Sequence, residues 1–203
     1  MSVVIIDYGM GNLGSVARAL EECGADVVIS DRPEDLHSAS HIILPGVGAF
    51  TEGMSNIYSG GWVPAIEIAV KQDNIPVLGI CLGMQLLADV GYEGGETKGL
   101  GLVKGQVRLL TSTSQERIPH VGWNEISKRT DSPLFASIPD RSDFYFVHSY
   151  HFEVNDQSQV ETVTPYCGSF VSSVRAGNVY GVQFHPEKSQ RSGFQLLRNF
   201  LSL

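Results

Sequence analysis

Hydrophobic residues in the first half of this 203-residue chain follow two alternating patterns. Short apolar runs with the composition of buried strands are found at Val3–Ile6, Val27–Ile29, Ile42–Leu44 and immediately before Cys81. Apolar residues recur at helical spacing at residues 13–20, ahead of Gly24, at about residues 62–72, and after Cys81. Strands that alternate with helices predict a parallel, doubly wound sheet whose ligands bind at the carboxyl ends of the strands.

The pattern changes after Leu102. Residues 103–110, 144–154, 159–166 and 170–175 are predicted to be strands of a more antiparallel part, with a hairpin turn at residues 176–178. A final helix is expected over Ser189–Leu203, with Phe194, Leu197 and Leu201 on one face. The predicted fold class is therefore α/β: one doubly wound, mostly parallel sheet flanked by helices, with an added antiparallel part in the C-terminal half. Residues 1–203 are expected to form a single domain.

Charge and cysteine content exclude several classes of protein. The chain has 14 Lys and Arg against 22 Asp and Glu, a formal net charge of −8, so nucleic-acid binding has no electrostatic support. Three cysteines do not make a disulfide framework, and Cys23 and Cys167, which have no motif around them, are predicted to be structural. The apolar stretch Val77–Ala88 is too short to span a membrane. No cationic signal segment opens the chain, so we expect a cytoplasmic protein.

Cys81 is the first candidate for chemistry, because it lies between a predicted strand and a predicted amphipathic helix with no residues left for a loop. Gly79 and Gly83 keep side chains away from so sharp a turn. Such a turn presents the cysteine at the sheet edge, as in a nucleophile elbow, and the N-terminus of the following helix favours the thiolate. The alternative is a small buried cysteine that packs like an alanine.

A matching base lies near the C-terminus. Residues two apart in extended chain point the same way, and Pro186 keeps His185 out of the helical region, so His185 and Glu187 project together. This arrangement allows Cys81 to be the nucleophile, His185 the general base and then acid, and Glu187 the carboxylate that orients the imidazole. Taken singly, each residue is better explained otherwise: His185 as a surface histidine in a strand-to-helix turn, and Glu187 as a charge at a helix N-terminus. The two segments together are far more specific.

Two glycine-rich loops follow predicted strands. Gly9–Gly14 has the spacing of a dinucleotide-binding loop, but only Asp31 loosely offers the acidic ribose ligand that such a site needs, so the match is weak. Pro45–Phe50 ends at the same sheet edge as Cys81, and its glycines allow the Val47 peptide to turn. The N–H groups of Val47 and Leu82 can then form an oxyanion hole. The alternative is an ordinary strand-to-helix turn.

Gly79–Gln85 and Gln183–Glu187 resemble the signature segments of class I glutamine amidotransferases. That resemblance implies hydrolysis of glutamine to glutamate through a cysteine thioester, with the ammonia handed to a synthase. Further segments are similar to the glutaminase subunits of imidazole glycerol phosphate synthases: Asp7–Asn12, Pro45–Phe50, Pro119–Asn124, Tyr145–Tyr150 and His185–Gln190. This similarity covers essentially the whole chain. It implies ammonia supply for imidazole glycerol phosphate and AICAR formation in histidine biosynthesis, with no metal or organic cofactor.

The resemblance also implies roles for individual positions. Cys81, His185 and Glu187 match the family triad, and Val47 and Leu82 match its oxyanion-hole amides. The positions that match the glutamine-binding pocket are Gly46, Gly48, Gln85, His148, Ser149 and Tyr150. The positions that match the face docking on a (β/α)₈-barrel partner, in a heterodimer, are Asn12, Trp123, Asn124 and Lys188. Trp123 is otherwise a core aromatic, although Gly122 and Asn124 beside it favour a turn.

The ammonia acceptor is open to other interpretations. His151 stands where tyrosine is the more usual residue in the histidine-pathway enzymes, and similar subunits supply ammonia for amidation of a surface-polysaccharide sugar. A glutaminase of another synthase, such as one for pyridoxal phosphate, anthranilate or guanylate, is a further alternative. A stand-alone cysteine hydrolase of γ-glutamyl substrates and a non-enzymatic binding module are the remaining ones, and the intact triad disfavours the last.

Overall fold

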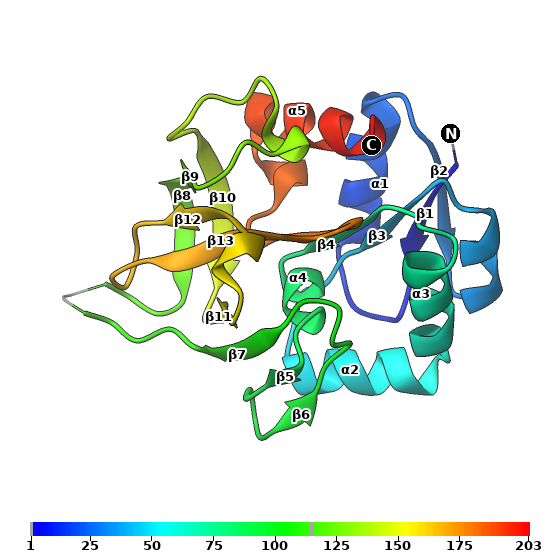
Figure 1. The fold of residues 1–203 in the computed structure, drawn as a ribbon, viewed down its shortest axis with the longest axis horizontal. Coiled ribbons are helices and arrows are strands. Elements are labelled where there is room, and N and C mark those ends of the chain that lie inside the picture. Colours follow the sequence, from blue (N-terminus) through cyan, green and yellow to red (C-terminus); the bar gives the residue numbers. More distant parts are fainter. Residues whose placement is uncertain (1, 114–115) are drawn as a thin grey trace.

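The computed structural model describes residues 2–113 and 116–203, which form a twelve-stranded mixed sheet with helices on both faces and a separate two-stranded sheet (Figure 1). The elements of the first half are β1 (Ser2–Ile6), α1 (Leu13–Glu22), β2 (Asp26–Ser30), η1 (Pro33–Ser38), β3 (His41–Leu44), α2 (Phe50–Ser59), α3 (Trp62–Lys71), β4 (Val77–Ile80) and α4 (Leu82–Leu86). Those of the second half are β5 (Val90–Gly91), β6 (Thr97–Lys98), β7 (Gly105–Leu109), β8 (His120–Glu125), β9 (Ser127–Lys128), η2 (Pro133–Phe135), β10 (Asp143–His148), β11 (Tyr150–Val154), η3 (Gln157–Gln159), β12 (Val160–Thr164), β13 (Phe170–Ala176), β14 (Val179–Val182), η4 (Pro186–Lys188) and α5 (Gln190–Leu201).

The main sheet has the strand order β2-β1-β3-β4-β14-β13-β11-β7-β5-β6, with β12 beside β13 and β9 beside β12. Neighbours from β2 to β14 are parallel, whereas β14 and β13 pair antiparallel through the predicted hairpin turn. The predicted fold class is thereby confirmed: a doubly wound parallel part continues into an antiparallel part formed by the C-terminal half.

Alternate residues of the parallel strands face opposite helical layers. Val3 of β1 belongs to a buried cluster with Leu20 of α1 and Phe200 of α5. The next residue, Val4, lies in the opposite cluster with Met54 of α2. Burial of β1, β3 and β4 on both faces explains why their sequences are continuous apolar runs. The edge strand β2 differs, because Val28 and Ile29 are exposed. No helix in the described parts of the chain is long and apolar enough to cross a lipid bilayer.

The prediction of one strand over residues 144–154 is wrong. The chain is divided at Ser149 into β10, which pairs with β8 in the separate two-stranded sheet, and β11, which pairs with β7 and β13 in the main sheet. Buried aromatic residues continue at alternate positions on both sides of the break, with Phe146 in β10 and Phe152 in β11. The apolar pattern therefore does not reveal where the strand changes partners.

Two helices also differ from expectation. The hydrophobic pattern did not predict α2, although Phe50, Met54 and Ile57 are buried on one face of it. The helix after Cys81 is not amphipathic, because all five residues of α4 are buried between β4, β14 and α2.

Trp123 does not lie in a turn, as its neighbours suggested. It lies inside β8 with a half-exposed side chain, so it is not a core aromatic either.

The packing of α4 predicts a strong asymmetry between two glycine substitutions. A Cβ atom on Gly83 would lie 1.8 Å from the Leu44 carbonyl oxygen, whereas one on Gly14 of α1 would meet nothing within 4 Å. We expect Gly83→Ala to lower the free energy of unfolding by about 3 kcal/mol, because backbone must move to admit the methyl group. Gly14→Ala is the matched control and should raise it by up to about 1 kcal/mol through helix propensity. Urea unfolding of both variants measures the difference, and equal stabilities would contradict this account of the turn.

Candidate active site

Cys81 occupies the turn between β4 and α4 in a backbone conformation rare for residues with side chains, with φ 55° and ψ −110°. Its N–H donates to the Val182 carbonyl of β14 at 2.8 Å, so the turn is fixed against the neighbouring parallel strand. A Cβ atom on Gly79 would lie 2.7 Å from the Gly83 carbonyl oxygen, which leaves no room for a side chain there. The sheet thus holds Cys81 in a strained conformation at its carboxyl edge.

His185 comes from the carboxyl end of β14, which runs parallel to β4 in register, with Val182 opposite Ile80. His185 Nδ1 lies 2.8 Å from Glu187 Oε1, and both side chains are almost fully buried. The His185 N–H donates to the Tyr145 carbonyl at 2.9 Å, which fixes the backbone that carries the imidazole. The predicted base and orienting carboxylate are therefore a hydrogen-bonded pair beside the Cys81 turn.

The electrostatics of His185 favour the charged imidazole. Burial lowers the pKa of His185, but interactions with Cys81 and Glu187 outweigh burial and raise the pKa to about 9. His185 is therefore protonated at neutral pH, while Nε2 is buried and makes no hydrogen bond to any described group. An imidazolium next to a cysteine is the arrangement in which the sulfur reacts as a thiolate.

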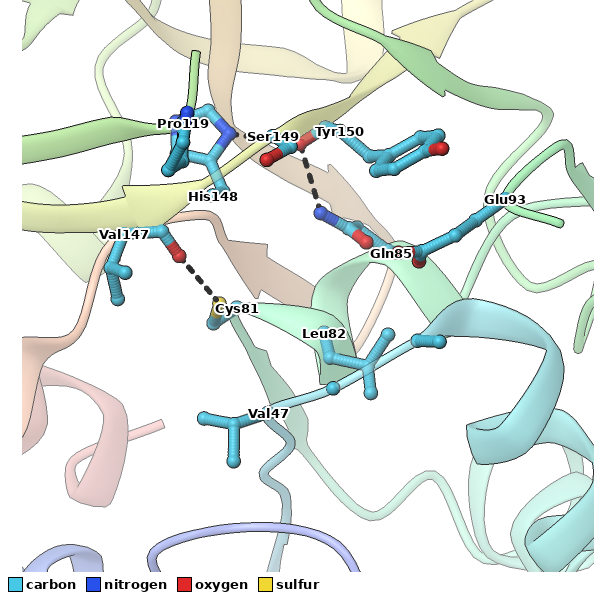
Figure 2. Close-up of a pocket in the computed structure, with 12 residues that line it drawn as sticks. Val47, Cys81, Leu82, Gln85, Glu93, Pro119, Val147, His148, Ser149 and Tyr150 are labelled. Carbon is cyan, nitrogen blue, oxygen red and sulfur yellow. Dashed lines mark hydrogen bonds between the residues drawn. The ribbon is translucent and has the colours of Figure 1, made fainter.

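A cavity of about 480 Å³ opens at Cys81 (Figure 2). Its lining consists of Val47, Gly48, Ala49, Cys81, Leu82, Gln85, Glu93, Pro119, Val147, His148, Ser149 and Tyr150. The lining includes every predicted pocket residue except Gly46, whose carbonyl is bonded to the Leu82 N–H instead. His148 is buried, and burial lowers its pKa to about 3, so the ring is neutral.

Neither of the two expected oxyanion donors is available in this conformation. The Leu82 N–H donates to the Gly46 carbonyl oxygen at 3.3 Å. Because the Val47 N–H belongs to the same peptide and points opposite to that oxygen, it is directed away from the site. Gly48 has φ +120°, a conformation that favours glycine, and a buried bond from the Tyr8 hydroxyl to the Pro45 carbonyl (2.8 Å) anchors the start of the loop. The Gly46–Val47 peptide must rotate before Val47 can donate.

Of the four predicted docking residues, Trp123 and Asn124 lie in β8, Lys188 lies in η4, and Asn12 caps helix α1. Trp123 of β8 is 48% exposed and packs edge-on against Tyr145, with 6.1 Å between ring centroids. The Lys188 ammonium lies 5.8 Å from the centroid of the same Tyr145 ring. Asn124, the neighbour of Trp123, points its amide at His120. Asn12 serves locally as the N-cap of α1, because its side chain accepts from the Ser15 N–H.

Several residues at the site were missed from the sequence. Glu93 lies in the loop between β5 and β6 and contributes a carboxylate to the cavity, but no motif surrounds it. Val147 accepts a hydrogen bond from the Cys81 thiol at 3.8 Å (Figure 2). Gln183 falls inside a signature segment, yet only the structure shows that its amide donates to the Cys81 sulfur at 3.8 Å. These contacts join segments far apart in sequence, so local patterns do not predict them.

Comparisons with solved structures place the fold. The chain resembles a structure described as a glutamine amidotransferase, with a TM-score of 0.74, 20% identity, and coverage of 98% of this chain and 97% of the other. It also resembles a chain in the structure of PurLQS from Thermotoga maritima, with a TM-score of 0.70, 22% identity, and coverage of 99% and 97%. At these identities the likeness establishes the fold alone.

Sequence comparisons extend over the same length. The chain is 44% identical over 201 residues to "Imidazole glycerol phosphate synthase subunit HisH 1" of Campylobacter jejuni, covering 99% of this chain and 100% of that protein. It is 46% identical over 198 residues to "Imidazole glycerol phosphate synthase subunit HisH" of Moorella thermoacetica, covering 98% and 93%. The family model for class-I glutamine amidotransferases matches residues 4–203. The chain therefore belongs to the class-I glutamine amidotransferase family.

Proposed function

We propose that this chain hydrolyses glutamine to glutamate and ammonia as the glutaminase subunit of an imidazole glycerol phosphate synthase. The observation that carries the proposal is that Cys81, which lines the cavity on its strained turn, interacts with the buried His185–Glu187 pair. Full-length similarity to proteins named as subunits of that synthase supports the choice of pathway over the polysaccharide and other synthase alternatives. The exposed face at Trp123 would receive the partner, a (β/α)₈ barrel.

In this mechanism the Cys81 thiolate attacks the side-chain amide carbon of glutamine, and the carbonyl oxygen takes up the negative charge. The His185 imidazolium then gives its proton to the departing nitrogen, which leaves as ammonia while the γ-glutamyl thioester remains on Cys81. The resulting neutral imidazole removes a proton from water, and the hydroxide formed cleaves the thioester to glutamate and free thiolate. Glu187 keeps the imidazole in one orientation throughout by accepting from Nδ1.

Recognition of the substrate would use charges and amides around the cavity. Glu93 is the acidic residue of the lining, and its Oε2 accepts from the Phe50 N–H at 2.8 Å, which holds the carboxylate in place. A fixed carboxylate at that position is complementary to the α-ammonium group of glutamine. The amide of Gln85, held by the Tyr150 carbonyl, would contribute a second polar contact.

Replacement of the nucleophile tests the proposal directly. Cys81→Ser should abolish glutamine hydrolysis, because a serine hydroxyl is a far weaker nucleophile than a cysteine thiolate. Synthesis from added ammonium salts by the complex with the barrel partner should persist, since that reaction does not use Cys81. Glu187→Gln should lose less glutaminase activity than His185→Ala, because it weakens the orientation of the imidazole without removing the imidazole. Glutamate release and ammonium-dependent synthesis are the two measurements, and substantial glutamine turnover by Cys81→Ser would overturn the assignment.

The closed oxyanion site predicts activation by the partner. In the free chain neither donor is available, because the Gly46 carbonyl occupies the Leu82 N–H and the Val47 N–H points away. A single oxyanion donor is worth about 10²–10³ in rate. We expect docking to favour the rotated Gly46–Val47 peptide, so that glutamine hydrolysis in the complex exceeds that of the free chain by at least this order. Steady-state glutaminase assays with and without the partner measure the ratio. Equal rates would instead favour the stand-alone hydrolase.

The raised pKa of His185 predicts how stability depends on pH. Because the pKa rises from 6.5 to about 9 on folding, the charged imidazole stabilises the folded chain fully below pH 6.5. This contribution, of order 3 kcal/mol at most, is lost as the pH increases toward 9. His185→Gln should therefore be destabilising near pH 6 and progressively less so at higher pH. Urea unfolding of both proteins across this range provides the test, and a difference that stays constant with pH would contradict the charged pair.

A further inference from the structure

A continuous series of hydrogen bonds joins strand β8 to the sulfur of Cys81. It crosses from β8 through two buried histidines to the joint between β10 and β11, and from there through two buried glutamines to the nucleophile. The side chains and backbone group in this relay are Asn124, His120, His148, the Tyr150 carbonyl, Gln85 and Gln183. The proposed mechanism assigns no role to His120 or Gln183.

The outer half of the relay has short, regular contacts. Asn124 Nδ2 lies 3.3 Å from His120 Nε2, and His120 Nδ1 lies 3.1 Å from His148 Nε2. His148 Nδ1 then lies 2.8 Å from the Tyr150 carbonyl oxygen. His120 stacks against Phe146 and Tyr166, with ring centroids 5.0 Å and 3.9 Å away, and these contacts restrict its ring.

The direction of every donor in this half follows from its two ends. A carbonyl oxygen only accepts, so His148 carries its proton on Nδ1 and accepts at Nε2. His120 must then carry its proton on Nδ1 and accept at Nε2 from the Asn124 amide. At the other end the Glu125 N–H donates to Asn124 Oδ1 at 2.9 Å, which leaves the Asn124 NH₂ group facing His120. The directions imposed from both ends agree.

The inner half continues from the same carbonyl. Gln85 Nε2 donates one hydrogen to the Tyr150 oxygen and the other to Gln183 Oε1, both at 3.0 Å (Figure 2 shows the first). With its oxygen engaged in this way, Gln183 directs its NH₂ group at Cys81 Sγ, 3.8 Å away. The same two bonds leave Gln85 Oε1 as the acceptor that the glutamine pocket can use.

Both histidines of the relay are neutral. Burial lowers the pKa of His120 to about 4 and that of His148 to about 3. Each ring therefore offers one donor and one acceptor at neutral pH, as the relay requires. A protonated His148 would present a second donor to the His120 Nδ1–H and break the bond between the histidines, whereas a protonated His120 would present one to the Asn124 amide and break that bond.

We propose that His120 is a positioning residue for glutamine hydrolysis and that the relay links the docking face of β8 to the pocket and to Cys81. His120 acts through His148, which fixes the Tyr150 carbonyl and hence the orientation of the Gln85 amide. Gln183 ends the relay as an N–H donor to the Cys81 thiolate. Val121 and Trp123 on either side of Gly122 are exposed, so a partner on β8 lies one residue from Asn124. This inference deepens the proposed function and rests on it.

The tautomers provide a test that needs no activity. Long-range ¹H–¹⁵N spectra of the free chain, with the two signals assigned by single substitutions, report which ring nitrogen carries the proton. We expect His120 and His148 both to be neutral Nδ1–H tautomers near pH 7. An Nε2–H tautomer or a charged ring at either position would overturn the relay, whatever the enzyme assay shows.

Glutamine binding then separates positioning from mere structural support. The binding experiments use the Cys81→Ser variant as background, because it binds glutamine without turnover. In that background His120→Phe keeps the aromatic packing but loses the donor to His148, and we expect the Kd for glutamine to rise about tenfold. His120→Asn places an amide N–H where Nδ1 was and should restore most of the affinity, although its smaller side chain packs less well and lowers stability more. Calorimetric titration and urea unfolding measure the two properties. The proposal would be overturned if the affinity for glutamine fell in step with the free energy of unfolding across the variants, or if the Kd were unchanged in His120→Phe. Failure of every variant to bind glutamine would instead overturn the proposed function.

The inner end of the relay is tested by the reactivity of Cys81. Gln183→Met removes the N–H donor to sulfur with little change in size, and Gln183→Glu keeps the acceptor for Gln85 but places an oxygen beside the thiolate. We expect alkylation of Cys81 by iodoacetamide at pH 7 to slow about tenfold in Gln183→Met and more in Gln183→Glu. Peptide mass spectrometry resolves Cys81 from Cys167, whose rate serves as the internal control. Unchanged Cys81 rates in both variants would remove Gln183 from the relay.

Discussion

The whole site depends on the turn that β4 makes at Cys81. A residue with a side chain is held there at φ 55° because the next turn of chain is pressed against the sheet, with no space for a Cβ atom on Gly83 beside the Leu44 carbonyl. Strain of this kind persists only where surrounding structure enforces it. The parallel pairing of β4 with β14 enforces it here, and the same pairing brings His185 to the sheet edge where the sulfur emerges.

A second constraint arises where the strand divides at Ser149. The residues before the break pair with β8 in the small sheet, and those after it pair with β7 in the main sheet. His148 therefore belongs to the small sheet and Tyr150 to the main sheet, and both line the cavity at Cys81. The two sheets are joined through a single residue here, at Ser149, and again at Ile126 between β8 and β9.

The sequence was sufficient for the parts of the fold that are built from local patterns. Apolar runs and helical spacing predicted the parallel strands, and the tight spacing around Cys81 predicted its turn. The change of pairing strand at Ser149 was not predictable. Phe144, Phe146 and Phe152 are all buried, so the alternation of buried residues continues through the break although the neighbouring strand changes. The turn suggested at Trp123 was also wrong, since a half-exposed aromatic inside a strand has no distinctive local pattern.

The orientation of the Gly46–Val47 peptide could not be predicted from the sequence, because both orientations are compatible with the same glycines. The structure shows why one is preferred without substrate: the buried Leu82 N–H needs an acceptor, and the Gly46 carbonyl supplies it. Rotating that peptide in an empty site would leave the donor unsatisfied, at a cost of about 1–3 kcal/mol. Under the proposed mechanism, the negatively charged oxygen of the reacting amide replaces the Gly46 carbonyl on the same donor. The Leu82 N–H that stabilises the resting conformation is thus the donor that the transition state requires, so reaction of the substrate favours rotation of the Gly46–Val47 peptide.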